Sequence, residues 1–192
     1  MGTAVQPAPE PLETVRAFVN TRDVESDVDA LATPAALAQW LHAAGLSTSV
    51  VSATSSDLQD ALAVREALRS ALVANHDGDA VPSPAFDVLS RAAERAEPAL
   101  RLDADAGWVA EPRAAGADGA LGALLSIVAG AMGDGTWRRL KVCVNDTCQW
   151  AFYDLSRARS GKWCSMQICG NRAKQQAWRA RHEESHRAAS GR

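Results

Sequence analysis

The four cysteines of the chain all lie within 27 residues near its C-terminus. They form two short-spaced pairs, Cys143-x4-Cys148 and Cys164-x4-Cys169, with fifteen residues between the pairs. Zn²⁺ in structural sites takes four ligands arranged as a tetrahedron, and thiolate sulfur is a ligand that it binds firmly. Each pair supplies two of these ligands from one tight turn. The spacing therefore predicts a single structural zinc ion bound by all four cysteines.

Disulfide bonds and an iron centre are the alternatives for these cysteines. Disulfides form in oxidising compartments, and the chain begins Met-Gly-Thr-Ala-Val-Gln-Pro, without the basic and apolar regions of a secretory signal. We therefore expect a cytoplasmic protein whose thiols are reduced. Iron stays open as an alternative, because a tetrahedron of sulfur ligands binds either metal.

The residues around the cysteines predict the local fold of this region. Asn145 and Asp146 lie inside the first pair, and both residue types favour tight turns because they tolerate left-handed backbone. The second pair leads into a helical stretch, so Cys164 precedes the helix and Cys169 lies near its start. We expect a small treble-clef or ribbon-like finger with a C-terminal helix.

The same region carries a recognisable motif. Cys169-Gly170-Asn171-Arg172 is the signature of the CGNR zinc-finger family, and residues 143–154, with Trp150 and Phe152-Tyr153-Asp154, resemble the first half of that finger. The resemblance implies a zinc-binding module that contacts nucleic acid.

The N-terminal part resembles the ABATE domain, the usual companion of this finger. The resemblance rests on Phe18-Val19-Asn20-Thr21, Leu31-Ala32-Thr33-Pro34 and Trp40-Leu41. ABATE domains occur in bacterial proteins described as stress-induced transcription regulators. Together the two resemblances cover residues 12 to 182, and they imply a sensor-like domain joined to a nucleic-acid-binding finger.

Hydrophobic periodicity and capping residues predict a mainly α fold. We expect a disordered Pro- and Ala-rich leader (1–11), a helical ABATE-like domain (12–135), the zinc finger (138–186) and a tail (187–192). The helices expected in the domain cover 12–19, 34–44, the stretch from a capping box at Ser56 and Gln59 to Val73, 84–96 and 118–132. Strands at 100–102 and 108–110 predict one minor β-hairpin.

The last helix of the finger carries an apolar stripe. At about 100° per residue, one narrow strip of its surface holds Met166, Cys169, Ala173, Ala177 and Ala180. We expect this stripe to lie against the zinc-binding turns, with the charged residues on its two flanks.

Charge divides the chain into two regions. Residues 138–192 hold twelve Lys or Arg and four Asp or Glu, a balance of +8. Residues 1–137 hold eight and nineteen, a balance of −11. A basic region is typical of a surface that binds phosphates. The alternatives are a solvated basic tail and an acidic N-terminal part that covers the basic finger.

Seven basic residues of the finger are candidates for contact with nucleic acid. They lie in the loop before Cys164 and on both sides of the last helix: Arg157, Arg159, Lys162, Arg172, Lys174, Arg179 and Arg181. The sequence does not choose between the two sides. Asn171 and Arg172 have a second interpretation, as residues that stabilise the metal-bound thiolates by hydrogen bonding.

The tryptophans and histidines of the finger have different expected environments. Trp150 and Trp163 are close to cysteines, so we expect them in its small hydrophobic core. Trp178 is equally compatible with core packing and with stacking on bases. His182 and His186 are one helical turn apart, yet the four cysteines already complete a zinc shell, so we expect both histidines to be solvated.

We therefore predict a transcription regulator that binds DNA through a structural zinc finger, with RNA or a protein as the alternative partner. Asn20, Arg65 and Arg69 are candidates for a small-molecule effector site in the N-terminal domain, although the two arginines have the alternative of an ion pair with Glu66. The sequence gives no indication of oligomeric state.

Two classes of function are excluded at this stage. No catalytic motif is present, and four protein ligands leave a zinc ion no open position for water, so we expect no enzyme. No apolar run reaches the roughly 18 residues of a membrane span. The longest run, 121–132, is shorter and contains glycine.

Overall fold

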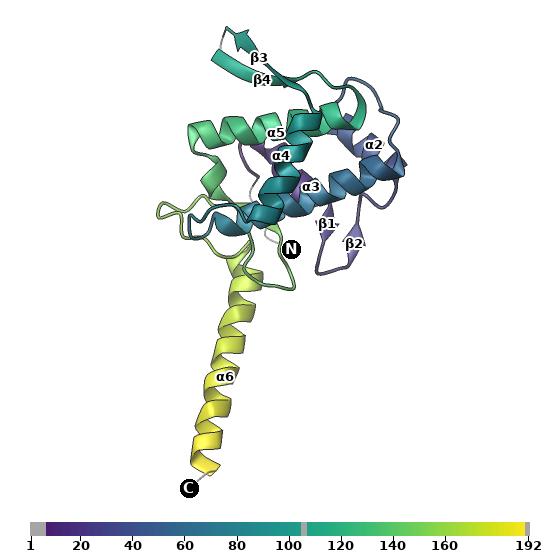
Figure 1. Cartoon of the computed structure of the whole chain (residues 1–192). Helices are drawn as coiled ribbons and strands as arrows, with labels where there is room; N and C mark the ends of the chain where they lie inside the picture. The colour runs from purple at the N-terminus through teal and green to yellow at the C-terminus, as the bar shows by residue number, and fades with distance from the viewer. Residues whose placement is uncertain (1–6, 105–106, 191–192) are drawn as a thin grey trace.

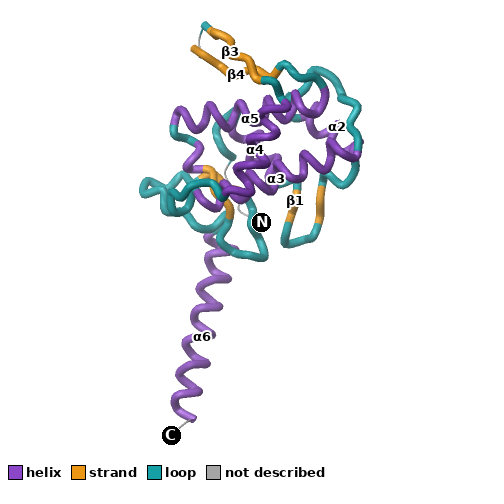
Figure 2. The backbone as a smooth tube through the Cα atoms, in the orientation of Figure 1, coloured by secondary structure: helices purple, strands orange, loops and turns teal. Residues whose placement is uncertain are grey.

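The computed structural model describes residues 7–104 and 107–190, and the side chains of these residues up to 182. The described part is mainly helical, and its strands form three separate antiparallel hairpins (Figure 1, Figure 2). The helices are α1 (Leu12–Val19), α2 (Pro34–Ala43), α3 (Ser55–Ala74), α4 (Ser83–Arg95), α5 (Gly116–Asp134) and α6 (Asn171–Ser190). The hairpins pair β1 (Arg22–Asp23) with β2 (Val28–Asp29), β3 (Pro98–Asp103) with β4 (Gly107–Pro112), and β5 (Leu140–Val142) with β6 (Ala151–Tyr153). The predicted fold class is confirmed.

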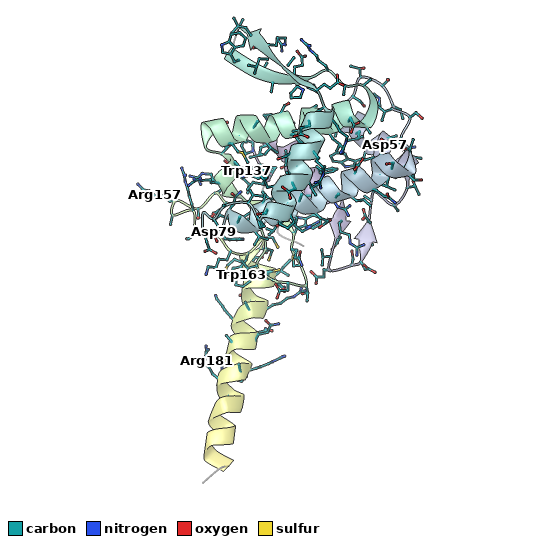
Figure 3. The ribbon with its side chains drawn as sticks, in the orientation of Figure 1. Asp57, Asp79, Trp137, Arg157, Trp163 and Arg181 are labelled. Carbon is teal, nitrogen blue, oxygen red and sulfur yellow. The ribbon has the colours of Figure 1, made fainter. Side chains whose placement is uncertain are left out.

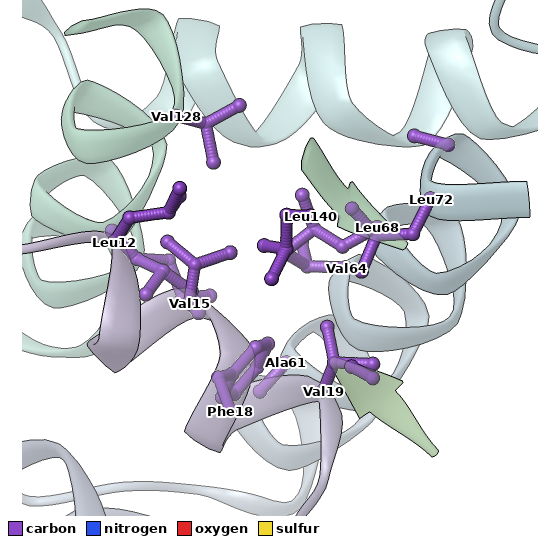
Figure 4. Close-up of a cluster of buried hydrophobic side chains, with 14 of the residues drawn as sticks. Leu12, Val15, Phe18, Val19, Ala61, Val64, Leu68, Leu72, Val128 and Leu140 are labelled. Atoms are coloured by element: carbon purple, nitrogen blue, oxygen red, sulfur yellow. The ribbon is translucent and has the colours of Figure 1, made fainter. Parts of the chain in front are cut away.

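The core of the N-terminal domain forms where α1, α3 and α5 meet (Figure 4). Each helix turns its apolar residues inward at helical spacing, and full burial of one such side chain stabilises the fold by about 1.5–3 kcal/mol. The buried set includes Leu12, Val15, Phe18, Val19, Val64, Leu68, Leu72, Leu121, Leu124 and Val128.

Side-chain caps set the helix starts. Thr33 caps α2 by accepting a hydrogen bond from the Ala36 N–H at 3.1 Å, as expected from its position before Pro34. The start predicted for α3 at Ser56 is wrong, because Thr54 is the N-cap. Thr54 Oγ1 accepts from the Asp57 N–H, and Asp57 Oδ2 accepts from the Thr54 N–H, so an earlier capping box begins the helix at Ser55.

The start of the chain and helix α5 each differ in part from what the sequence predicts. Residues 1–6 of the predicted leader lie outside the described residues. Ala8 is buried, and its N–H donates to Glu13 Oε2 at 2.7 Å, so the chain is already ordered at that point. Helix α5 is longer than predicted, and it is long and apolar enough to cross a membrane, as core helices also can be. Its inner side instead packs in the core through Leu121, Leu124 and Val128.

The finger begins inside this core. A short 3₁₀ turn, η1 (Trp137–Arg139), leads from α5 into β5, and the hydrophobic cluster that contains Phe18 and Leu68 also contains Leu140, Val142 and Ala151. The boundary predicted between residues 135 and 138 therefore separates two regions of the sequence that share one core.

Two elements project from the rest of the molecule (Figure 1). The β3–β4 hairpin is longer than predicted and pairs Leu102 with Trp108 across its two strands. Helix α6 extends away from the body at the opposite end. The expectation that the alanine stripe of α6 packs on the zinc-binding turns is wrong, because Ala177 and Ala180 are exposed and only Ala173 is half-buried.

Candidate metal centre and nucleic-acid interface

The four predicted cysteines come together at one point. Their Sγ atoms all lie within 4.8 Å of one another, with Cys148 and Cys164 3.6 Å apart and Cys164 and Cys169 3.7 Å apart. Ligands about 2.3 Å from a tetrahedral zinc ion are roughly 3.8 Å from each other, whereas disulfide sulfurs are about 2.05 Å apart. All four cysteines are free. The cluster is thus positioned to coordinate one metal ion, consistent with one structural Zn²⁺.

The electrostatics of the cluster also fit a cation. Hydrogen bonds with Cys148 and Cys164 lower the pKa of Cys143 to about 2. The same contact with Cys143 raises the pKa of Cys148 to about 12, and contacts with Cys143 and Cys148 raise the pKa of Cys164. One thiolate therefore suppresses ionisation of its neighbours. A divalent cation at the centre is what allows all four sulfurs to be thiolates at once.

The turn between the first two cysteines is held by Asn145. Its carbonyl oxygen accepts from the Cys148 N–H at 2.8 Å, and its side-chain oxygen accepts from the Thr147 N–H at 3.2 Å. Its Nδ2 lies 3.8 Å from the sulfur of Cys169, so this side chain donates to a ligand of the opposite pair. Sequence reasoning took Asn145 only as a turn former and missed this contact.

The second pair lies on an unusual helical turn. The π-helical turn η2 (Met166–Gly170) contains Cys169 and leads directly into α6. A Cβ at Gly170 would lie 2.6 Å from Met166 Sδ and 3.3 Å from Trp163 Cδ1, so only glycine fits without a shift of those side chains. The cysteines pack against Trp150 and Trp163, as predicted.

The other two signature residues have partners away from the sulfurs. Asn171 Nδ2 donates to the Gln167 carbonyl oxygen at 3.0 Å, within the same helical stretch. Arg172 Nη1 donates to Glu25 Oε1 at 2.6 Å, which links the start of α6 to the turn between β1 and β2. Among the described contacts of these signature residues, none is a hydrogen bond to a thiolate.

A buried ion pair anchors the loop that precedes Cys164. Lys141 Nζ lies 3.0 Å from Asp154 Oδ2 and 2.5 Å from the Arg159 carbonyl oxygen, and both side chains of the pair are buried. Asp154 also accepts from the N–H groups of Ser156 and Gly161. Burial acts to raise the pKa of Asp154, but these hydrogen bonds and Lys141 outweigh it and hold the pKa at about 2. Sequence reasoning missed Lys141, whose one signal is a charged residue between the apolar Leu140 and Val142.

The anchored loop, residues 155–163, is called the basic loop below. It exposes the predicted Arg157, Arg159 and Lys162. The predicted residues of α6 are exposed as well: Arg172, Lys174, Arg179 and Arg181. All seven candidates are therefore solvent-accessible, on the loop that precedes Cys164 and on the helix that follows Cys169.

The three candidates for an effector site each have partners within the protein. Asn20 bonds both backbone groups of Ala151 in β6. Arg65 binds Asp29 of β2 through two hydrogen bonds of 2.7 and 2.8 Å. Arg69 donates to the carbonyl oxygens of Val19 and Gln149, each at 2.8 Å. Both arginines also pair with Glu66, and two surface pockets of about 260 and 740 Å³ are lined by other residues.

Comparison with known families finds two matches along the chain. Residues 13–134 match the ABATE family model, described as "Putative stress-induced transcription regulator". Residues 139–182 match the model of the CGNR zinc finger, which includes all four cysteines. No curated protein matches the chain.

Proposed function

The chain belongs to the ABATE family and carries a CGNR zinc finger after the ABATE domain, and from this premise we propose that it regulates transcription by binding DNA through the finger. The observation that carries the proposal is the anchored basic loop. The buried Lys141–Asp154 pair holds the backbone of the loop at Arg159 and Gly161, and the side chains of Arg157, Arg159 and Lys162 are exposed. A loop whose backbone is already held has less backbone entropy to lose when its basic side chains contact phosphates.

The metal has a structural role in this proposal. Cys143 and Cys148 flank the turn before β6, and Cys164 and Cys169 bracket the start of the helical stretch that ends in α6. A zinc ion bound by all four would fix the basic loop and α6 relative to each other. No open coordination position remains for water, and on this ground we propose that the protein is not an enzyme.

The N-terminal domain has the position of a sensor in this scheme. Asn20 and Arg69 bind the backbone of the finger on both sides of Trp150, so a change in α1 or α3 would reach the finger directly. We propose that a small-molecule effector or a stress signal acts on this domain in the cytoplasm. The family description and the contacts of Asn20 and Arg69 with the finger support this proposal.

Binding of zinc-loaded, full-length protein to labelled duplex DNA across a salt series tests the proposal. Each phosphate contact contributes about −0.9 to the slope of log K against log salt. We expect Arg157→Ala/Lys162→Ala to weaken binding and to make this slope shallower by about 2. The matched control is Arg91→Ala/Arg113→Ala, which removes two exposed arginines of the N-terminal domain and should leave both quantities unchanged.

A Cys143→Ser/Cys164→Ser variant separates the role of the metal from that of the charges. It keeps every basic residue, and we expect it to lose both zinc and specific binding. Absence of duplex binding at low salt with zinc bound would contradict the proposal. Binding to RNA, or to a protein partner with little salt dependence, would then be the function to pursue.

A further inference from the structure

Helix α6 is exposed on all sides between Asn171 and His182, apart from the half-buried Ala173. A polar helix without a packing partner gains little stability from tertiary contacts. Its diameter of about 10–12 Å matches the width of the DNA major groove, about 12 Å. An exposed polar helix of this diameter is suited to bind in the groove of a nucleic acid. Its two sides carry different side chains.

The side chains of α6 divide into two faces at about 100° per residue. The tryptophan face carries Lys174, Trp178, Arg181 and His182. The arginine face, on the other side of the helix, carries Arg172, Gln176 and Arg179. Each face has two basic residues, so net charge alone does not distinguish them.

Acidic residues of the N-terminal domain lie beside the arginine face. Arg172 pairs with Glu25 at 2.6 Å, and the β1–β2 hairpin carries Asp23, at the end of β1, and Asp27, just before β2, on either side of Glu25. Arg22 pairs with Asp27 and Arg172 pairs with Glu25, so the three carboxylates and these two arginines leave a net charge of −1 beside this face. A duplex laid on the arginine face would bring its phosphates against these carboxylates, and like charges at close range repel.

The tryptophan face lies away from this acidic hairpin. Trp178 is 54% exposed and stacks on His182, with ring centroids 3.9 Å apart and planes tilted by 32°. Such an indole keeps most of its apolar surface in water until a ligand covers it. In the view of Figure 3, Arg181 and Arg157 of the basic loop lie toward one edge of the molecule, whereas Figure 1 places β1 and β2 toward the other.

We propose that the tryptophan face of α6 enters the major groove of duplex DNA while the basic loop contacts the adjacent phosphate backbone. This inference rests on the proposed DNA binding and adds which side of the helix performs it. Lys174 and Arg181 supply donors to base edges or phosphates, and the stacked Trp178–His182 pair supplies apolar contact of the kind that thymine methyl groups accept. The arginine face stays turned toward the β1–β2 hairpin.

Two arginines on opposite faces provide the test. Arg181→Gln and Arg179→Gln remove the same charge, two positions apart, from exposed sites on one helix. We expect Arg181→Gln to raise the Kd for duplex DNA about tenfold, as loss of one groove contact does, and Arg179→Gln to raise it by less than about threefold. Trp178→Ala should also raise the Kd about tenfold without changing the zinc content. Far-UV circular dichroism confirms that each variant keeps its helix.

The outcomes separate this inference from the proposed function. Equal losses from the two arginine variants, or a larger loss from Arg179→Gln, would overturn the choice of face. Tighter binding to the single strand of the same sequence than to the duplex would overturn the inference that α6 binds in the major groove. If the zinc-loaded wild type binds no duplex DNA at low salt, the proposed function itself fails.

Discussion

Asn20 and Ala151 are joined by two hydrogen bonds: Asn20 Nδ2 donates to the Ala151 carbonyl oxygen at 2.9 Å, and the Ala151 N–H donates to Asn20 Oδ1 at 2.7 Å. The side-chain amide thus binds β6 as a neighbouring strand would. It fixes the end of α1 to the finger, 131 positions further along the chain.

Asn20→Ala should lower the free energy of unfolding by about 2–3 kcal/mol. The substitution leaves the N–H of the fully buried Ala151 without its partner, and an unsatisfied buried backbone group costs about 1–3 kcal/mol. Urea denaturation of the zinc-loaded protein measures this. Gln175→Ala removes an exposed amide of α6 and should cost less than about 0.5 kcal/mol. Equal losses from the two variants would contradict the role given to Asn20.

The stability contributed by Asp154 should depend on pH. Its pKa is lowered to about 2 in the folded protein, whereas an unfolded aspartate titrates near 3.9. The contribution, about 2–3 kcal/mol, is therefore fully present above about pH 4 and is lost as the pH falls toward 2. Urea denaturation of wild type and Asp154→Asn between pH 3 and 7 should show a difference that shrinks on acidification. Zinc release in acid affects both proteins, so a constant difference would count against this account.

Replacing either of two glycines of α5 by alanine should change the stability of the protein, in opposite directions at the two positions. A Cβ at Gly122 would lie 2.4 Å from Ala96 Cβ and 2.9 Å from Pro112 Cβ, so Gly122→Ala overpacks the contact with β4 and should cost about 1–3 kcal/mol. Gly130 has open space around the same position, and Gly130→Ala should stabilise the helix by about 0.5–1 kcal/mol. Thermal unfolding resolves the two signs, and a stable Gly122→Ala protein would show that the helix shifts freely.

Asn145→Ala should weaken zinc binding about 10–100-fold while one zinc ion per chain is still bound. The reason is the contact between its Nδ2 and the sulfur of Cys169, since residues that bond a metal ligand tune its affinity by this amount. Competition with a chelator measures the change. Asn171→Ala is the matched control, because Asn171 bonds a backbone oxygen, and a larger effect there would reverse the assignment.

The metal site was predictable because its information is local. Four cysteines within 27 residues, separated by turn and helix formers, leave few arrangements other than one cluster. The start of α2 at Pro34, after its N-cap Thr33, was predictable for the same reason. At Thr54 the same logic failed by two positions, because Thr54 with Asp57 and Ser56 with Gln59 both satisfy a capping pattern and only the backbone geometry decides.

Contacts between distant segments had no local signal. Asn20, Arg65 and Arg69 were candidates for an effector site because they could project from neighbouring helices into one pocket. The structure gives each of them protein partners that are distant in sequence, and the alternative ion pair of both arginines with Glu66 is confirmed. The apolar stripe of the last helix likewise led us to expect that α6 packs on the zinc-binding turns. Periodicity shows that one side of a helix carries small apolar residues, but it does not show that another element packs against that side. In α6, Ala177 and Ala180 on this side are exposed to solvent.

The core shared between α1, α3 and the β5–β6 hairpin also determines when this protein can finish folding. Leu140, Val142 and Ala151 complete the cluster around Phe18 and Leu68, and a ribosome makes them after the whole ABATE domain. The domain therefore leaves the ribosome with a gap in its interior that only the finger closes. A chain that ends before Leu140 would therefore lack buried residues of the core that supports α1 and α3.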